Sequence, residues 1–146
     1  MKNTLLILFL ISLLQFSAQP QTIQYNAVLM HDSIVAPNRF EFDIYVKRVS
    51  EGEFKAYGFQ IALIMDDSIR NNGILTAEYI MGTSEMNPLF QIPDNPNVSV
   101  LIGKKRIFKI SAKTSIEGAT LISNIGKGTR LGRFAIITSA HSFAYI

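Results

Sequence analysis

The chain has 146 residues, with 14 basic side chains, 11 acidic side chains, two histidines and no cysteine. The lack of cysteine excludes disulfides, a thiolate zinc site, a cysteine nucleophile and a lipid anchor on cysteine, so stability must come from apolar burial. The net charge of +3 is too small to indicate a nucleic-acid partner, and we expect no metal and no cofactor.

The N-terminal segment, residues 1–18, has the pattern of a secretory signal peptide. Lys2 precedes an apolar run over residues 5–14, and Ala18 is a small residue suited to cleavage. As a helix the run would be about 15 Å long, half of the hydrocarbon thickness of a membrane, so we interpret it as an export signal and not as a membrane span. We therefore expect residues 19–146 to be secreted or displayed on the cell surface as one domain.

Strict alternation of apolar and polar side chains marks residues 39–47 as a half-buried strand. The expected core face holds Phe40, Phe42, Ile44 and Val46, and the expected solvent face holds Arg39, Glu41, Asp43, Tyr45 and Lys47. Residues 23–35 are expected to form the strand before it. Residues 56–65 also alternate between two faces, and the second face is less polar than that of residues 39–47, which predicts a central strand. We expect a hairpin connection between this strand and residues 39–47.

Further strands are expected toward the C-terminus. Residues 74–80 and 129–138 are predicted strands, and the segments 98–102 and 106–112 are predicted to form a hairpin. The connection over residues 81–97 has three prolines and several large apolar side chains, so we expect it to pack over an edge or an end of the domain. No segment has helical periodicity, and seven or eight such strands predict an all-β antiparallel sandwich.

Three stretches carry a resemblance to a known family: RFEFDIYVKR at 39–48, AYGFQIALIMDDSIRNNG at 56–73 and KGTRLGRFAIIT at 127–138. Their order resembles the cohesin-like β-sandwich domain of secreted and surface-displayed bacterial proteins, which is related in fold to carbohydrate-binding modules. The resemblance implies a flattened jelly roll that binds protein or glycan, or acts as a spacer, and has no enzymatic activity.

The C-terminal segment departs from that pattern. The residues SAHSFAYI at 139–146 break off where the family would continue into another strand. We therefore expect one or more closing strands to be missing. A truncated reading frame, or the N-terminal piece of a longer protein with covalently linked downstream domains, would account for this.

Charge is unevenly distributed along the chain. Residues 19–100 hold five basic and ten acidic side chains, whereas residues 101–146 hold eight basic side chains and one acidic side chain. One interpretation is a patch for an anionic polymer, formed by Lys104, Lys105, Arg106, Lys109, Lys113, Lys127, Arg130 and Arg133. We favour the other, in which late strands lie beside early ones and the opposite charges face each other.

The candidate ligand-binding residues are Tyr45, Glu41, Asp43 and Lys47. An aromatic ring on a solvent-facing strand can stack on a sugar, and the neighbouring charges can bond its hydroxyl groups. The alternative, which we favour, is a tyrosine that covers its neighbours.

The catalytic interpretation pairs Glu41 with Asp43, about 7 Å apart along the strand, as in a glycosidase. The flanking cations Arg39 and Lys47 favour two ionised acids instead, so no catalytic residue is assigned.

Two further motifs have simpler explanations. Asp66, Asp67, Asn71 and Asn72 supply oxygen atoms of the kind that calcium accepts, but their spacing fits a turn better than a known calcium loop. Gly126, Gly128 and Gly132 do not match a nucleotide-binding fingerprint, and we expect them to allow a tight turn and a bulge.

These observations favour a non-catalytic extracellular binding or display module whose ligand is protein or glycan. A glycan ligand predicts a row of exposed aromatic rings that includes Tyr45. A protein ligand predicts an exposed apolar patch that includes residues 81–92. A carbohydrate-binding module is the main alternative, and a fragment of a secreted glycoside hydrolase is the least favoured.

Overall fold

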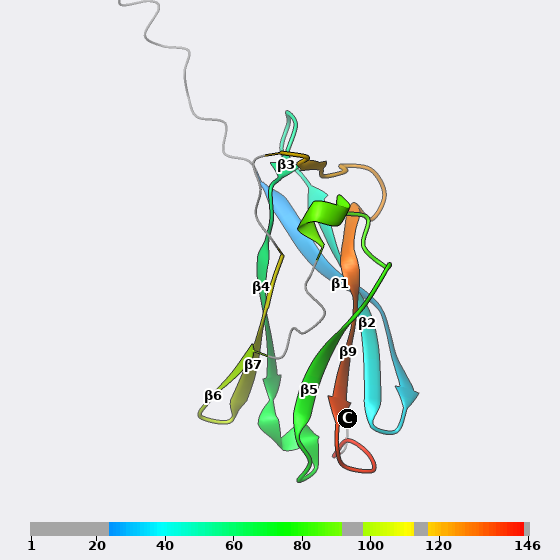
Figure 1. Cartoon of the computed structure of the whole chain (residues 1–146), viewed down its shortest axis with the longest axis vertical. Helices are drawn as coiled ribbons and strands as arrows, with labels where there is room; N and C mark the ends of the chain where they lie inside the picture. The colour runs from blue at the N-terminus through cyan, green and yellow to red at the C-terminus, as the bar shows by residue number, and fades with distance from the viewer. Residues whose placement is uncertain (1–23, 92–97, 113–116, 145–146) are drawn as a thin grey trace, which may run out of the picture.

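The fold is an all-β sandwich of antiparallel sheets, as the sequence predicts. The computed structural model describes residues 24–91, 98–112 and 117–144, and Figure 1 shows its two main layers. The predicted signal peptide lies outside the described residues. The four-stranded sheet has the order β1-β2-β9-β5, and the three-stranded sheet has the order β4-β7-β6. The four-stranded sheet consists of β1 (Tyr25–Ala36), β2 (Arg39–Arg48), β9 (Thr129–Thr138) and β5 (Leu75–Ile80). The three-stranded sheet that faces it consists of β4 (Gln60–Asp66), β7 (Lys105–Ser111) and β6 (Val98–Ile102).

Strands β2 and β9 form the centre of the four-stranded sheet. They pair antiparallel from Arg39↔Ile137 to Val46↔Thr129. The register shifts after Ile44↔Gly132, so Leu131 forms a bulge there, in the glycine-containing segment where the sequence predicts one. Alternate residues of both strands point into the sandwich, and this inner face, with the facing side of β7, forms the core. The buried side chains of this core include Phe42, Phe108, Ile110, Phe134 and Ile136.

Strand β4 has the predicted faces but not the predicted place. Ile61, Leu63 and Met65 pack against the core, while Ile64 is exposed on the other face. However, among the residues that the structure describes, β4 pairs with β7 alone, so it is an edge strand and not a central one. The expected hairpin between β2 and β4 is also wrong, because the chain crosses there from one sheet to the other. Alternation identifies the faces of a strand but not its neighbours.

Short elements close the ends of the sandwich. Residues β3 (Lys55–Ala56) and β8 (Thr120–Leu121) form a two-stranded ladder that the sequence did not predict. The 3₁₀ helices η1 (Asp67–Arg70) and η2 (Pro88–Phe90) lie within the two predicted connections. Asn71 and Asn72 follow η1 directly, and both have positive φ, which confirms the predicted turn.

The described part of the long connection packs against the domain, as expected. Met86 and Phe90 are buried in the core, whereas Met81 and Leu89 are exposed. The remaining expected contact, Ile92, lies outside the described residues. The described part of the connection therefore contributes core side chains, and of these four large apolar side chains only Met81 and Leu89 are available to the apolar patch expected over residues 81–92.

The turn before β9 depends on Gly128. Its φ is +91°, and a β carbon there would contact the backbone of β2, at Val46 O and 2.8 Å from Lys47 Cα. Gly126 also has positive φ, but a β carbon there would meet nothing within 4 Å. The two glycines thus share a conformational constraint and differ in the space around them.

We expect Gly128→Ala to lower the free energy of unfolding by about 3 kcal/mol or more, because it adds a backbone clash to the cost of a left-handed residue. Gly126→Ala, which carries only the conformational cost, should lose about 1 kcal/mol. Chemical denaturation of both variants measures the difference. Equal losses would show that the approach to β2 does not constrain the turn.

Candidate functional site

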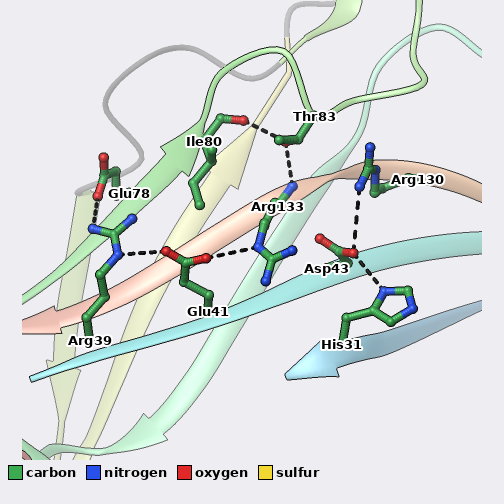
Figure 2. A network of polar contacts seen from close by, with 9 residues as sticks. All are labelled: His31, Arg39, Glu41, Asp43, Glu78, Ile80, Thr83, Arg130 and Arg133. Carbon is green, nitrogen blue, oxygen red and sulfur yellow. Dashed lines mark hydrogen bonds and ion pairs between the residues drawn. The ribbon is translucent and has the colours of Figure 1, made fainter. Parts of the chain in front are cut away.

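The four predicted ligand-binding residues lie together on the outer face of the four-stranded sheet. Glu41, Asp43, Tyr45 and Lys47 alternate along β2 and so point to the same side. The register places Arg133 of β9 opposite Asp43, and Arg130 opposite Tyr45. Figure 2 shows the polar network that results. Its members are supplied by β1, β2, β5 and β9 and by the connection after β5.

Glu41 is held between two arginines. Its carboxylate accepts hydrogen bonds from Arg39 Nε at 2.8 Å and from Arg133 Nε at 3.0 Å. Arg39 also donates to Glu78 Oε2 on β5 at 2.6 Å, so the network crosses three strands. The hydrogen bond from Arg39 lowers the pKa of Glu41, with Arg133 acting in the same direction and burial opposing both. An ionised acid held in this way cannot serve as a proton donor in a glycosidase pair near neutral pH.

Asp43 corrects the prediction of a solvent-facing residue, because it is only 2% exposed. His31 Nδ1 lies 2.8 Å from its Oδ2, and Arg130 Nη1 lies 3.7 Å from the same atom. Oδ1 has no hydrogen-bond partner among the described residues. His31 reaches Asp43 from an irregularity in β1 between Met30 and Ser33, where its φ is +51°.

Tyr45 is likewise buried, at 2% exposure, so the expectation of an exposed aromatic ring is wrong. Lys127 Nζ lies 4.6 Å from the ring centroid, and the imidazole of His31 contacts the ring edge at a centroid distance of 6.0 Å. Lys47 Nζ donates to Gly126 O at 2.9 Å, which ties the turn before β9 to β2. The ring therefore presents no free face for a sugar, and a row of exposed aromatic rings including Tyr45 is not formed.

The connection after β5 continues along β9 beside this network. Thr83 Oγ1 accepts a hydrogen bond from Arg133 N, and Glu85 Oε2 accepts one from Arg130 N. Glu85 N donates to Arg130 O at 2.9 Å. These contacts hold the two arginines in place, and no local pattern predicts them because the partners are 45 and 50 positions apart.

Other charges are paired as well, and four of the late cations, Lys105, Arg106, Arg130 and Arg133, each face an acid from the earlier part of the chain, in agreement with the structural interpretation. Arg106 Nε donates to Asp67 Oδ1 at 2.6 Å, and Arg70 Nε donates to its Oδ2 at 3.0 Å. The bond from Arg106 is the main cause that lowers the pKa of Asp67. Lys105 approaches Asp66, which also caps η1. Within the described residues no group of three or more histidine, aspartate and glutamate side chains is placed to hold a metal ion.

An apolar groove lies on a different side of the sandwich, between the edge strands β1 and β4. The half beside Leu29, here called the lower half, is a cavity of about 280 Å³. The described residues that line it are all apolar and include Leu29, Leu63, Met65 and Phe143. The half beside Tyr25, here called the upper half, is a cavity of about 390 Å³ whose lining includes Tyr25, Phe59 and Leu131. Successive inward residues of β1 line first one half and then the other, so the two cavities are consecutive parts of one feature, the β1–β4 groove.

The groove exists because the two sheets differ by one strand. The inward side chains of β5 are buried, with Leu75, Ala77 and Tyr79 at 4% exposure or less. The inward side chains of β1 are open, with Tyr25 at 57% and Leu29 at 49% exposure. The three-stranded sheet therefore covers the β5 side and leaves β1 uncovered. The sequence identified the apolar faces but not this lack of cover.

Comparison of the chain with family models, with curated proteins and with solved structures finds no match. The resemblance to cohesin-like domains therefore stays a prediction. In the part of the chain that the structure describes, no helix has the length and apolar character needed to cross a membrane.

Glu41→Gln should remove two charge-assisted contacts and lower the free energy of unfolding at pH 7 by about 1 kcal/mol. Because the pKa of Glu41 is depressed in the folded state, its stabilisation is present above the unfolded pKa and is lost as pH falls through the folded pKa. The variant should thus lose stability less steeply than wild type below about pH 5. Urea denaturation across this range tests the slope.

The control for this prediction is Glu53→Gln. Glu53 lies 3.5 Å from Lys55 in an exposed pair, so its replacement should change stability at pH 7 by less than about 0.5 kcal/mol. An acid-side slope of Glu41→Gln identical to that of wild type would contradict the assignment.

Tyr45→Ala should lower the free energy of unfolding by about 3 kcal/mol or more, because it removes a buried ring from beneath Lys127 and His31. Tyr57→Ala is the matched control, since Tyr57 is 48% exposed and its loss should cost less than about 0.5 kcal/mol. Thermal denaturation compares the two. A Tyr45 variant as stable as the Tyr57 variant would show that the ring is not part of the packing.

Proposed function

We propose that this chain is a non-catalytic binding module of an exported protein, and that its ligand is a protein segment and not a glycan. The observation that carries the proposal is the β1–β4 groove. It is open, it extends along two strands, and none of the described side chains that line either half is charged. Contiguous exposed apolar surface of this kind is typical of protein-interaction sites.

The chemistry of the groove supports a protein ligand over a polysaccharide. A glycan requires hydrogen-bond partners for its hydroxyl groups, and the lower half of the groove supplies only apolar side chains. The polar residues first considered for sugar contact, Glu41, Asp43 and Lys47, are bonded to arginines, a histidine and a carbonyl group of the chain itself. A side chain already engaged in this way must break a bond before it can hold a hydroxyl.

A non-catalytic role agrees with the state of the acidic residues. Glu41 lies between Arg39 and Arg133, and Asp67 lies between Arg106 and Arg70. The arginines favour the ionised carboxylates, whereas acid catalysis near neutral pH requires a raised pKa.

An extracellular location agrees with the signal-like pattern of residues 1–18 and with the absence of any need for a reduced thiol. A module of a secreted or surface-displayed bacterial protein is also what the resemblance to cohesin-like domains implies. On this proposal the sandwich is the scaffold and its open side is the binding surface.

The proposal is tested with the variant Leu29→Asp, which places a charge in the groove, and the matched control Val28→Asp. Val28 is 45% exposed on the opposite face of β1, so the control adds the same charge outside the groove. Peptides are selected from a random phage-displayed library on the wild-type protein, and insoluble cellulose and chitin are tested in parallel. We expect selected peptides to lose affinity about tenfold or more for Leu29→Asp and to keep it for Val28→Asp.

Two results would contradict the proposal. One is retention on polysaccharide that is unchanged by Leu29→Asp, together with the failure to select any peptide. The other is equal loss of peptide affinity in both variants, which would place the peptide on the outer face of β1.

A further inference from the structure

Strand β4 has a free backbone edge along the groove, and the register shows which groups it exposes. Ala112 N donates to Phe59 O at 3.0 Å, and Asp67 N donates to Lys104 O at 2.8 Å. In an antiparallel ladder only every second residue bonds a given neighbour. The odd-numbered residues of β4 therefore bond β7, and the N–H and C=O groups of Gln60, Ala62 and Ile64 point to the opposite edge. Among the described residues no strand pairs with that edge.

Within the described chain, this edge has little of the usual protection against strand addition. Exposed edges are commonly blocked by proline, by charged side chains or by a covering loop. Residues 60–65 of β4, QIALIM, contain no charge and no proline, and the one charge of the strand, on its last residue Asp66, lies 3.4 Å from Lys105. The position beside β4 is also the position that would cover the open inward face of β1, where Leu29 is 49% exposed.

We propose that the ligand of the groove is an extended peptide that adds to the free edge of β4 as a fourth strand of the β4-β7-β6 sheet. Its alternate side chains are apolar and uncharged and pack against Tyr25, Ala27 and Leu29 of β1. This inference rests on the proposed function and names the manner in which the protein ligand binds. Main-chain hydrogen bonds supply affinity in such complexes, and the pockets for alternate side chains supply specificity.

The width of the open side favours a single strand over a second folded copy. The four-stranded sheet has one strand more than the three-stranded sheet, and the inward side chains Tyr25 and Leu29 of its edge strand β1 are open, so we infer that the recess beside β4 has room for one strand. A second copy that paired its own β4 there would bring its β1 against the β1 of the first. The uncharged lining likewise matches an uncharged ligand face, since a buried unpaired charge is costly.

The described C-terminal residues lie at one end of this recess without filling it. Phe143 lines the lower half of the groove, and Ala144 N donates to Ile69 O at 3.0 Å. The exposed groups from Gln60 to Ile64 span about 13 Å of strand, so a ligand of about five to seven residues in the extended form would match them.

The test uses a synthetic peptide of about nine residues with alternating valine and threonine and a lysine at each end for solubility. Amide hydrogen exchange is measured on the full chain with and without the peptide. We expect the exchange of Gln60, Ala62 and Ile64 to slow about tenfold or more on binding, because these amides gain partners. A peptide in which every second residue is N-methylated, so that it cannot bond the edge, should not bind.

A proline substitution tests the edge from the side of the protein. Ala62→Pro removes one outward N–H, a change that edge strands accept, and should weaken binding about tenfold. Leu101→Pro is the matched control. Since β7 uses its even-numbered residues for β4, it bonds β6 through its odd-numbered ones, so the N–H of Leu101 points to the other free edge of the same sheet. That variant should bind as wild type does.

The outcomes separate this inference from the proposed function. If peptides bind and Leu29→Asp prevents it, but the edge amides stay unprotected and the N-methylated peptide binds equally well, strand addition is overturned and the proposed function stands. If no peptide binds, both are overturned. Protection of the same amides by a concentration-dependent dimer without peptide would overturn the assignment of the ligand. Should Ala62→Pro fail to fold, the N-methylated peptide still decides on the wild-type protein.

Discussion

The pairing of β2 with β9 is the interaction on which the rest of the structure depends. It joins residues 39–48 to residues 129–138 and thereby ties the N-terminal hairpin to the strand that follows all the others in the described chain. On the inner side it brings Phe42 against Phe134, at a centroid distance of 6.0 Å. On the outer side it sets Arg133 opposite Asp43, so the same register builds both the core and the polar network.

A chain without cysteine must hold such a sandwich together by burial and polar contacts alone. The outer face of the four-stranded sheet is accordingly not a simple solvated surface. The bonds of Glu41 to Arg39 and Arg133, and of Arg39 to Glu78, link the three strands β2, β9 and β5. Arg130 and His31 close over Asp43. Exposed ion pairs contribute little one by one, but a network around a buried carboxylate fixes the positions of its members. The consequence for function is that this face is already occupied by its own side chains, and the side between β1 and β4 is not.

Periodicity in the sequence was sufficient to predict the strands and their faces. The predicted strands 39–47, 74–80 and 129–138 correspond to β2, β5 and β9, and the hairpin around Gly103 is present. Ile61, Leu63 and Met65 of β4 point inward as expected. The burial of Asp43 and Tyr45 could not be predicted, because their cover comes from His31 and Lys127, which no local pattern places there. The same limit applies to the groove. A period of two shows that β1 and β4 each have an apolar face, but only the strand order shows that nothing in the described chain lies between them.

The order of the strands has a consequence for how this chain folds. β1 and β2 are adjacent in sequence and pair locally, whereas β9, which lies between β2 and β5, follows every other strand of the described residues. The middle of the four-stranded sheet is thus the last part to be synthesised. Contacts between distant residues form slowly, because the intervening chain must first be brought together. Until residues 129–138 are present, β2 and β5 lack the strand that joins them, so the four-stranded sheet is incomplete. The sandwich therefore cannot assemble progressively from its N-terminal end. Folding of the sandwich must therefore wait for nearly the whole described chain.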